Sequence, residues 1–441
     1  MALGTDTAAR VGAPIEASIP GDVGEARRAR LDIVVGLARI YRRWSSAEIA
    51  AALGRPAGKV APRSGNPKLD LVARLADAID WELGDLAESL WFAEPAPLDD
   101  GLDATRIDEL DAHAQIAHRR GDFESMEAIG LAMRRIAKTP GERATAANRL
   151  AGAYDGMGRF PRVLACVREG LAEHSIGVDI RTMLTVNLAN AHSTLWNLRE
   201  AESIASAMIV ELRDPARRTN RIGRVAWAHA HAVRGHALRR SLVHAHDAVA
   251  SRVVAVRAEG DLLEAERLFL ALWEEYGDAH YRGLASTALG GAVEAGVAAG
   301  RIDAHEALEQ VFARLDAAVE PSSAPAELAE SLGWWSVYGA NIAFRAGENR
   351  LSAQRERSDL DRAIAICTNK AIEIAEHLDH WAMRERAFTL EWSRRGRRLG
   401  DAESEPWSLD DEDIRVLVGT MGRFPLFRPT GWAILGASFE R

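Results

Sequence analysis

A short turn motif recurs along most of this chain of 441 residues. Each copy is a glycine, a polar residue and a large apolar residue, and it stands between two stretches that favour helix. The copies begin at Gly121, Gly158, Gly260 and Gly300, and Trp196–Ala201 is a version without glycine. Their starts are 37, 38, 64 and 40 residues apart, and 64 is close to two units. Periods of this size are typical of stacked helix pairs, because one pair cannot bury its apolar face alone.

Nearly the whole sequence favours helices over strands. Alanine, leucine, arginine and glutamate dominate it, and apolar residues recur at steps of three and four. Within residues 31–41 the expected apolar stripe is Val34, Leu37, Ile40 and Tyr41. No stretch alternates in the manner of a strand, and no Asn-Gly or Asp-Gly turn joins two β-branched runs. We therefore expect an all-α protein.

The residues around one turn indicate how two helices would pack. Small Ala151 allows the helices to approach closely, and Tyr154 fills the space below it. Gly158 can take the left-handed conformation that ends a helix, and Phe160 can pack back over it. This arrangement resembles the tetratricopeptide repeat (TPR), and the resemblance covers roughly residues 106–392. It implies a TPR-like α-solenoid whose concave surface binds a peptide or an extended partner.

The first helices of successive units would line this concave surface. Polar side chains on them are the candidate residues for binding an effector: Asn148, Asn187, Asn190, Arg224, His231, Asn341 and Arg345. Asparagine suits the task, because its amide can donate to and accept from a peptide backbone together. For any one of these residues the alternative is a side chain that faces solvent or satisfies a helix end.

Positive charge is concentrated near the N-terminus, although the whole chain carries a net charge of −9. Between Arg30 and Lys68 there are eight basic residues and only two acidic ones, Asp32 and Glu48. A protein of negative net charge is not expected to coat nucleic acid along its whole length. A basic head on an acidic body instead favours one local contact with a polyanion.

Three elements follow one another in and after this basic segment: Ser46–Gly54, Gly65–Leu69 and Leu75–Ile79. Their order and spacing resemble the Cro/repressor-type (XRE) helix-turn-helix family, and the match spans about residues 31–92. The resemblance implies a small helical domain that binds DNA. The residues that we expect to contact DNA are Ser46, Arg55, Lys59, Arg63 and Lys68.

The segment that would form the recognition helix departs from the family pattern. It lies between Arg55 and Gly65 and is about three residues shorter than the pattern. Gly58 weakens a helix by about 1 kcal/mol and Pro62 by about 3 kcal/mol, so at most about one and a half turns can form. Reading of bases would then be reduced, while contacts with phosphates remain. The alternative is a helical docking domain with ordinary surface arginines.

Loop signals divide the chain into five parts. We expect a disordered tail over residues 1–29, a helix-turn-helix domain over 30–93, a linker over 94–105, TPR-like helical repeats over 106–400 and a C-terminal helical cap over 401–441 that covers the last repeat. Within the repeats, residues 220–259 have no clear register and form either two helices or one bent helix.

The sequence contains no motif that indicates catalysis or metal binding. Its two cysteines, Cys166 and Cys367, lie far apart, and the HExxH, GxSxG and GxxxxGK[ST] patterns are missing from it. A histidine-rich stretch over residues 229–246 would place its i, i+2 pairs on different sides of a helix, which favours packing over metal ligation. We therefore expect no enzyme, no metal and no cofactor.

The combination of helix-turn-helix and repeats resembles bacterial transcriptional regulators whose repeats sense a peptide or a partner protein. The resemblance implies DNA and an effector as partners and leaves room for a homodimer. No apolar run reaches the roughly 18–20 residues of a membrane span, and residues 1–26 lack the pattern of a signal peptide, so we expect a cytoplasmic protein. The alternatives are a TPR adaptor whose relic helix-turn-helix no longer binds DNA, and an enzyme with an unrecognised site.

Overall fold

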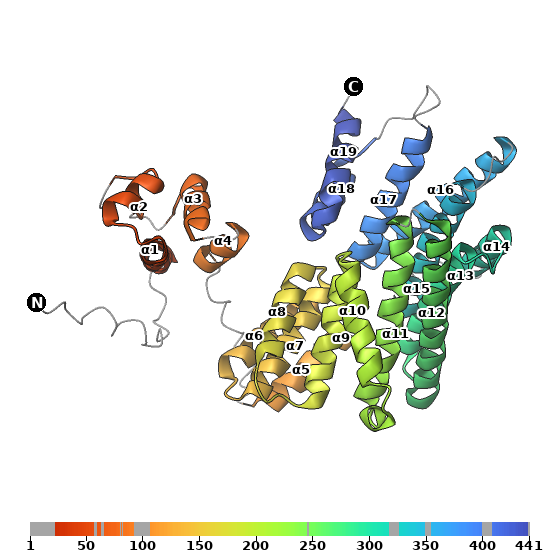
Figure 1. Ribbon diagram of the computed structural model, residues 1–441, viewed down its shortest axis with the longest axis horizontal. Coiled ribbons are helices and arrows are strands. Elements are labelled where there is room, and N and C mark those ends of the chain that lie inside the picture. Colours follow the sequence, from red (N-terminus) through yellow and green to blue (C-terminus); the bar gives the residue numbers. More distant parts are fainter. Residues whose placement is uncertain are drawn as a thin grey trace, which may run out of the picture. The chain divides into compact units, whose positions relative to one another are not determined.

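The structure is a computed structural model, and it describes residues 23–56, 60–62, 66–79, 81, 83–91, 106–244, 247–316, 326–348, 354–398 and 408–439. Every regular element in these ranges is a helix, which confirms the all-α prediction. The chain divides into two compact units, Met1–Pro97 and Leu98–Arg441. Figure 1 shows the helices of both units in sequence colours.

The described residues of the first unit form four helices: α1 (Val23–Arg42), α2 (Ser46–Ala52), α3 (Leu69–Ile79) and α4 (Leu83–Trp91). Helix α1 contacts each of the other three. Ser45 caps α2 in a capping box with Glu48, because its hydroxyl accepts from the Glu48 backbone N–H. The buried leucines of α1, α3 and α4, among them Leu31, Leu75 and Leu86, form the core of this unit.

Two expectations about α1 are wrong. Residues 23–29 are helical and do not belong to a disordered tail, and Arg27 lies 5.3 Å from the Trp91 ring and donates to Asn66. Residues 1–22 lie outside the described residues. The core face of α1 is also not the expected stripe, because Leu37, Ile40 and Tyr41 are 48%, 71% and 59% exposed. The buried face carries Leu31, Val34 and Ala38, since the other three helices pack on that side.

The second unit is longer and entirely helical in its described residues. It contains α5 (Ile107–Arg119), α6 (Phe123–Ile136), α7 (Pro140–Gly156), α8 (Phe160–Ala172), α9 (Val178–Thr194), α10 (Leu198–Glu211), η2 (Pro215–Arg218), α11 (Arg221–Ser241), η3 (Leu242–His244), α12 (Ala248–Tyr276), α13 (Ala279–Ala298), α14 (Ala304–Asp316), α15 (Ala326–Glu348), α16 (Gln354–His377), α17 (Trp381–Arg398), α18 (Asp411–Arg423), η5 (Pro425–Phe427) and α19 (Arg428–Phe439).

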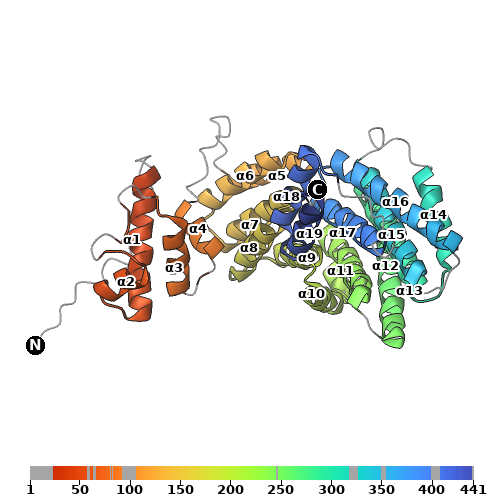
Figure 2. The same cartoon turned by 90° about the horizontal axis from the view of Figure 1, so that it is seen from above.

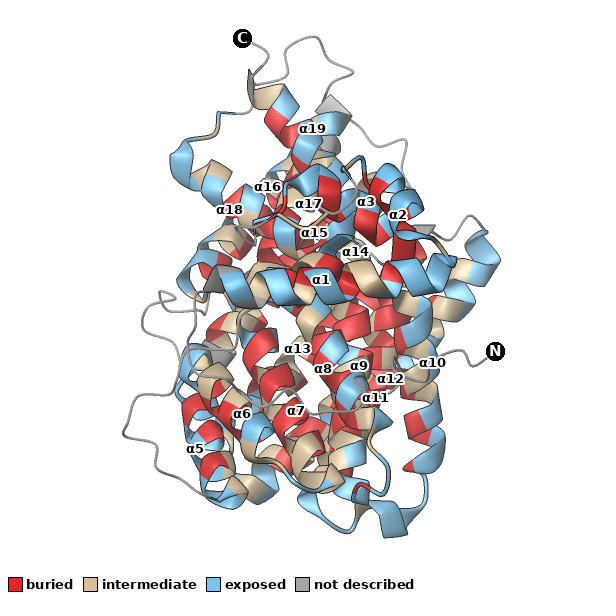
Figure 3. Ribbon diagram, turned by 90° about the vertical axis from the view of Figure 1, so that its left-hand side faces the viewer, coloured by how far each residue is buried: buried red, intermediate tan, exposed pale blue. Residues whose placement is uncertain are grey.

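From α5 to α13, each helix packs on the one that follows it, and each odd-numbered helix from α5 to α17 also contacts the next odd-numbered helix. The odd-numbered helices therefore form one continuous row, with the even-numbered helices beside it (Figures 1 and 2). Buried residues gather on the sides of the helices that face their neighbours (Figure 3). Small side chains allow this close packing; Gly130, for example, lies so close to Leu150 that a Cβ would not fit.

The predicted turn between two helices is confirmed at three of the four glycines, and the prediction is wrong at the fourth. Gly121, Gly158 and Gly300 end helices with φ values of 69°, 68° and 70°, and Trp196 takes the same left-handed conformation with φ 65°. Gly260, in contrast, lies inside the 29 residues of α12. The motif fails there because the Asp261 carboxylate does not cap a new helix but binds α11. The uncertain stretch 220–259 is two helices, since α11 ends before α12 begins.

The C-terminal helices α18 and α19 contact α17. They also reach helices near the start of the array (Figure 2). The Phe424 ring lies 5.3 Å from the Phe160 ring at the start of α8, and Arg423 Nε donates to the Met157 carbonyl oxygen over 3.4 Å. Trp381 of α17 packs against Gly158 so closely that a Cβ there would collide with it. The helical array is therefore closed on itself by contacts between residues more than 200 positions apart.

Candidate functional site

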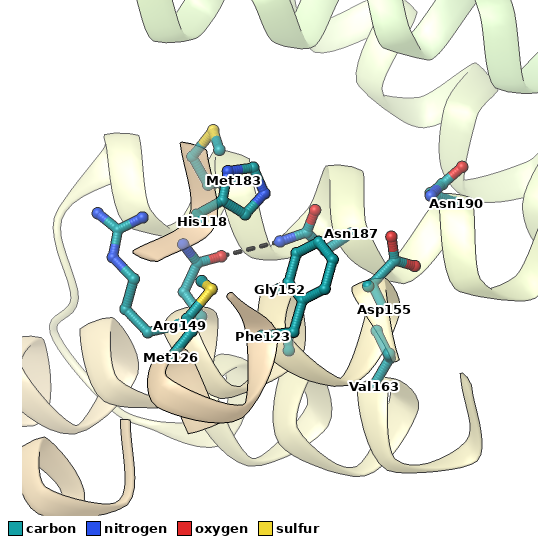
Figure 4. A pocket seen from close by; sticks show the side chains of 13 residues that line it. His118, Phe123, Met126, Arg149, Gly152, Asp155, Val163, Met183, Asn187 and Asn190 are labelled. Atoms are coloured by element: carbon teal, nitrogen blue, oxygen red, sulfur yellow. Dashed lines mark hydrogen bonds between the residues drawn. The ribbon is translucent and has the colours of Figure 1, made fainter. Parts of the chain in front are cut away.

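A pocket with a volume of about 240 Å³ lies among helices α5 to α9. Three of the predicted effector residues line it, Asn148 on α7 and Asn187 and Asn190 on α9. Figure 4 shows Asn187 and Asn190 among the other lining side chains. Asn187 Nδ2 donates to Asn148 Oδ1 over 2.9 Å. The two residues are 39 positions apart in sequence, about one repeat unit, so they hold the same place in neighbouring units. The amide of Asn190 makes no hydrogen bond to any described residue and is exposed to solvent.

Two glycines of α7, which were not predicted as site residues from the sequence, also line the pocket. Gly152 and Gly156 follow Asn148 at steps of four, so all three share one face of the helix. The absence of a Cβ lets Phe123 and Met126 of α6 approach this face. The signal was present in the sequence as Asn148-xxx-Gly152-xxx-Gly156, at the i, i+4 spacing of a helix face.

Charged groups surround the amides of this pocket. Arg149 donates from Nε to Asp111 Oδ1 over 2.6 Å and from Nη2 to Asp111 Oδ2 over 3.1 Å. Water reaches Asp155, yet burial by the surrounding protein raises the pKa of its carboxyl to about 6, with His380 opposing and Glu330 adding to the shift. Burial also lowers the pKa of His118, and the charges of Arg149 and His280 add to that effect. At neutral pH the pocket therefore holds neutral histidine, one paired arginine and a carboxylate that is readily protonated.

This arrangement can hold a stretch of peptide backbone. The amide groups can donate to carbonyl oxygens and accept from N–H groups of an extended chain. Among the apolar residues of the pocket, half-buried Phe123 can offer its ring to a side chain, whereas Met126 and Val163 are 2% and 1% exposed. A few polar groups among apolar ones are typical of binding pockets.

The other four predicted effector residues lie elsewhere. Arg224 donates to Glu275 over 2.7 Å and lines a second pocket. His231 is buried against Asp261, and Asn341 donates to Glu294 over 3.2 Å. Arg345 is half-buried and lines neither of the two pockets. The structure therefore gathers Asn148, Asn187 and Asn190 but separates the remaining four from them.

Two of these four belong to buried ion-pair clusters. Arg234 holds Asp261 with two hydrogen bonds of 2.6 and 2.7 Å, and His231 Nδ1 lies 2.9 Å from the same carboxylate. Burial opposes ionisation of Asp261, but the hydrogen bonds from His231 and Arg234 prevail and lower its pKa. Glu294 is held by Arg239 over 2.5 Å in the same way. Charges satisfied in this manner fix helix packing and are poor candidates for ligand contact.

The histidine-rich stretch is also part of the packing in its described residues. His229 lies 5.1 Å from the Phe269 ring, and burial lowers its pKa to about 4. His236 stacks on Tyr338, and burial lowers its pKa well below the ordinary value. The His244 side chain and His246 lie outside what the structure describes. Within the described part of the chain, no group of three histidine, cysteine or acidic side chains is placed to hold a metal ion.

Both cysteines are buried in the helical array. Burial raises the pKa of the Cys166 and Cys367 thiols to about 12. A thiol of such high pKa is protonated at neutral pH and is a weak nucleophile. Neither cysteine is therefore a candidate for covalent chemistry.

The predicted DNA-contacting residues are spread around the loop between α2 and α3. Ser46 is exposed in the first turn of α2, Arg55 is half-buried and Lys68 is exposed just before α3. Lys59 and Arg63 lie outside the described residues. The described residues of this loop, 55–56, 60–62 and 66–68, are not helical.

One further arginine near this loop is already occupied. Arg42 donates from Nε to the Ala78 carbonyl oxygen over 2.7 Å and from Nη2 to the Asp77 carbonyl oxygen over 3.0 Å. It thus satisfies carbonyl groups at the end of α3, where a helix lacks its own donors. Arg42 consequently fixes α1 to α3.

No helix among the described residues is long and apolar enough to cross a membrane. The chain matches no family model, no curated protein and no solved structure. The argument for its function therefore rests on the geometry of the two units.

Proposed function

We propose that this protein is a DNA-binding transcriptional regulator whose TPR-like α-solenoid binds a peptide or protein effector. The observation that carries the proposal is the asparagine group Asn148, Asn187 and Asn190, which lines a pocket and in which Asn148 on α7 and Asn187 on α9 are 39 positions apart and hydrogen-bonded. Amide side chains on successive helix pairs can form hydrogen bonds with a ligand whose polar groups recur along its length. The N–H and C=O groups of an extended peptide backbone recur in this way.

The row of odd-numbered helices supports the TPR-like part of the proposal. Helix pairs joined by left-handed turns at Gly121, Gly158, Trp196 and Gly300 follow one another with the spacing of stacked repeats. In such an array the first helix of each pair faces the concave side, and here these helices carry the three asparagines.

Selection from a library of random heptapeptides displayed on their own mRNA tests the effector site. The full-length protein is expected to enrich peptides that bind at least about tenfold more weakly when Asn148, Asn187 and Asn190 are all changed to alanine, since each amide contributes about 1 kcal/mol. The matched control is Asn341→Ala, because Asn341 hydrogen-bonds Glu294 outside the pocket. Failure to enrich any peptide, or equal binding by the triple variant, would refute the effector site.

The excess of basic residues between Arg30 and Lys68 of the first unit supports its contact with DNA. Lys68 is exposed and Arg55 half-buried, and neither forms an ion pair with a described residue. Lysine and arginine side chains placed in this way bind phosphates and release counterions, so that binding weakens as salt rises. The contact that we propose is mainly with the DNA backbone, because the described loop residues do not form a recognition helix.

Fluorescence anisotropy on a 30-base-pair duplex between 25 and 300 mM salt tests this contact. Changing Arg55, Lys59, Arg63 and Lys68 to alanine is expected to make the slope of log K against log salt shallower by about one unit for each phosphate that the variant no longer binds. The control removes the same charge from four exposed arginines of the second unit, Arg119, Arg120, Arg199 and Arg252. Absence of DNA binding by the native protein at every salt concentration would overturn this half of the proposal.

The second candidate function is an adaptor that binds a peptide without binding DNA. Two observations favour it: the described residues between α2 and α3 are not helical, and Arg42 is bound to the end of α3. An adaptor would select peptides through the asparagines but would show no anisotropy change with DNA. The two experiments together therefore distinguish the regulator from the adaptor.

A further inference from the structure

A second pocket, with a volume of about 270 Å³, lies between η2, α11 and α12. Its floor is apolar and consists of Trp227, Leu268, Ala271 and Leu272. Arg218 and Arg224 also line it. No residue lines both this pocket and the asparagine pocket. The volume is just below the range of about 300–1,000 Å³ that is typical of pockets for drug-sized ligands, so a smaller ligand fits it.

The position of Arg218 depends on a glycine in α11. A Cβ on Gly223 would collide with the Arg217 carbonyl oxygen, so only glycine lets η2 pack on the first turns of α11. Asp214 caps η2 by accepting from the Ala216 backbone N–H over 2.9 Å. This packing holds the Arg218 guanidinium 4.6 Å from the centre of the Trp227 ring. The pocket is thus bordered by a cation in a fixed position.

The two arginines of the pocket differ in their partners. Arg224 is neutralised by Glu275, to which it donates over 2.7 Å. Arg218 forms no ion pair with a described carboxylate and donates from Nη2 only to the Arg213 carbonyl oxygen, over 3.1 Å. Its Nε is buried and has no hydrogen-bond partner among the described residues. Glu264, whose pKa the Arg218 charge helps to lower, is already held by Arg267 over 2.6 and 2.8 Å.

Solvent does not reach this Nε, so a ligand would meet the guanidinium at its Nη groups. One guanidinium without a counter-ion matches one negative charge, and a carboxylate accepts from such a group in charge-assisted hydrogen bonds. The apolar floor beside it matches an aliphatic chain. We propose that this pocket binds a small aliphatic monocarboxylate, with the carboxylate on Arg218 and the chain over Trp227, Leu268 and Ala271.

Isothermal titration of the full-length protein with octanoate tests the site. Octanoate is expected to bind at least about tenfold more tightly than octanamide, which lacks the charge, and than acetate, which lacks the chain. Arg218→Gln is expected to remove this preference, whereas Arg217→Gln is the matched control, because exposed Arg217 pairs with Glu211 and does not line the pocket. Equal binding of octanoate and octanamide to the native protein overturns the proposal even if a variant does not fold.

The same chemistry occurs in a fatty acid and at the C-terminus of a peptide that ends in leucine. Titration with such a pentapeptide, with its C-terminus free or amidated, separates the two sources. A preference for the free peptide over octanoate assigns the site to a peptide terminus, and the reverse assigns it to a fatty acid. The alanine variant of Asn148, Asn187 and Asn190 is expected to bind octanoate as the native protein does, so this proposal and the effector proposal can fail independently.

Discussion

The contact between Phe160 and Phe424 provides a direct test of whether the helical array is closed in solution. The two rings lie 5.3 Å apart and are 6% and 3% exposed, although they are separated by 264 positions in the chain. Each single change to leucine is expected to lower the free energy of unfolding by on the order of 1–2 kcal/mol, as is usual for buried residues. An aromatic pair contributes about 0.5–1.5 kcal/mol beyond its buried area, and either single change already removes this contribution. The double variant should therefore be less destabilised than the sum of the single variants by that amount.

Urea unfolding followed by circular dichroism measures all four proteins of this double-mutant cycle. The control cycle combines Phe424→Leu with Phe269→Leu, because Phe269 is 1% exposed but packs in a different cluster, against Tyr281. The control changes should add within about 0.3–0.5 kcal/mol. If the Phe160 and Phe424 changes were equally additive, the two ends of the array would not be in contact and the closed arrangement would be refuted.

Three further predictions follow from single residues. The pKa of Asp155 rises from 3.8 to about 6 on folding, so the folded protein binds this proton more tightly than the unfolded chain does. The contribution of this carboxyl to the free energy of unfolding therefore decreases as the pH rises from about 4 to about 6. Asp155→Asn should therefore be more stable than the native protein at pH 7, and this gain, measured by urea unfolding, should vanish below pH 4; a gain independent of pH would contradict it. Gly158→Ala and Gly121→Ala both place a Cβ at φ near 70° and should each lose about 1–2 kcal/mol. Only Gly158→Ala also displaces Trp381, so its melting temperature should fall further, and equal shifts would show that Trp381 does not pack there. Arg42→Ala removes two hydrogen bonds to the end of α3 and should destabilise the first unit by about 1–2 kcal/mol. The control Arg39→Ala should cost less than about 0.5 kcal/mol, because Arg39 donates to Ser46 over a long distance of 3.4 Å. Hydrogen exchange of the α3 backbone amides measures the difference between the two variants.

The local features of the fold could be predicted because their causes are local. Gly121, Gly158 and Gly300 end helices since the left-handed conformation suits glycine, and the spacing of Asn148 and Asn187 follows from the repeat period. Gly260 has the same neighbours in sequence as the true turns, yet it continues a helix. The difference arises from Arg234, which is 27 positions away from Asp261 and binds it. A pattern read along the chain does not contain that contact.

The remaining errors have the same origin in long-range packing. Two apolar stripes on α1 compete for the core, and the choice of Leu31 and Val34 over Leu37 and Ile40 depends on where α2 to α4 lie. The pKa of Asp155 is raised mainly by burial, which His380 opposes and Glu330 reinforces, and both of these groups are distant in sequence. Arg218 could not be identified as a site residue either, because its importance comes from a guanidinium without an ion pair to a described carboxylate, which only coordinates reveal.

The first unit has a core of its own, built only from α1 to α4 and their connections. A domain of this size buries a smaller share of its surface than a large one, roughly 60% for about 60 residues, and is correspondingly easier to melt. Any polyanion that binds only its folded form would stabilise it by mass action, by about 2.7 kcal/mol at a concentration one hundred times the dissociation constant. The occupancy of the first unit by such a polyanion would thus set the temperature at which this unit unfolds.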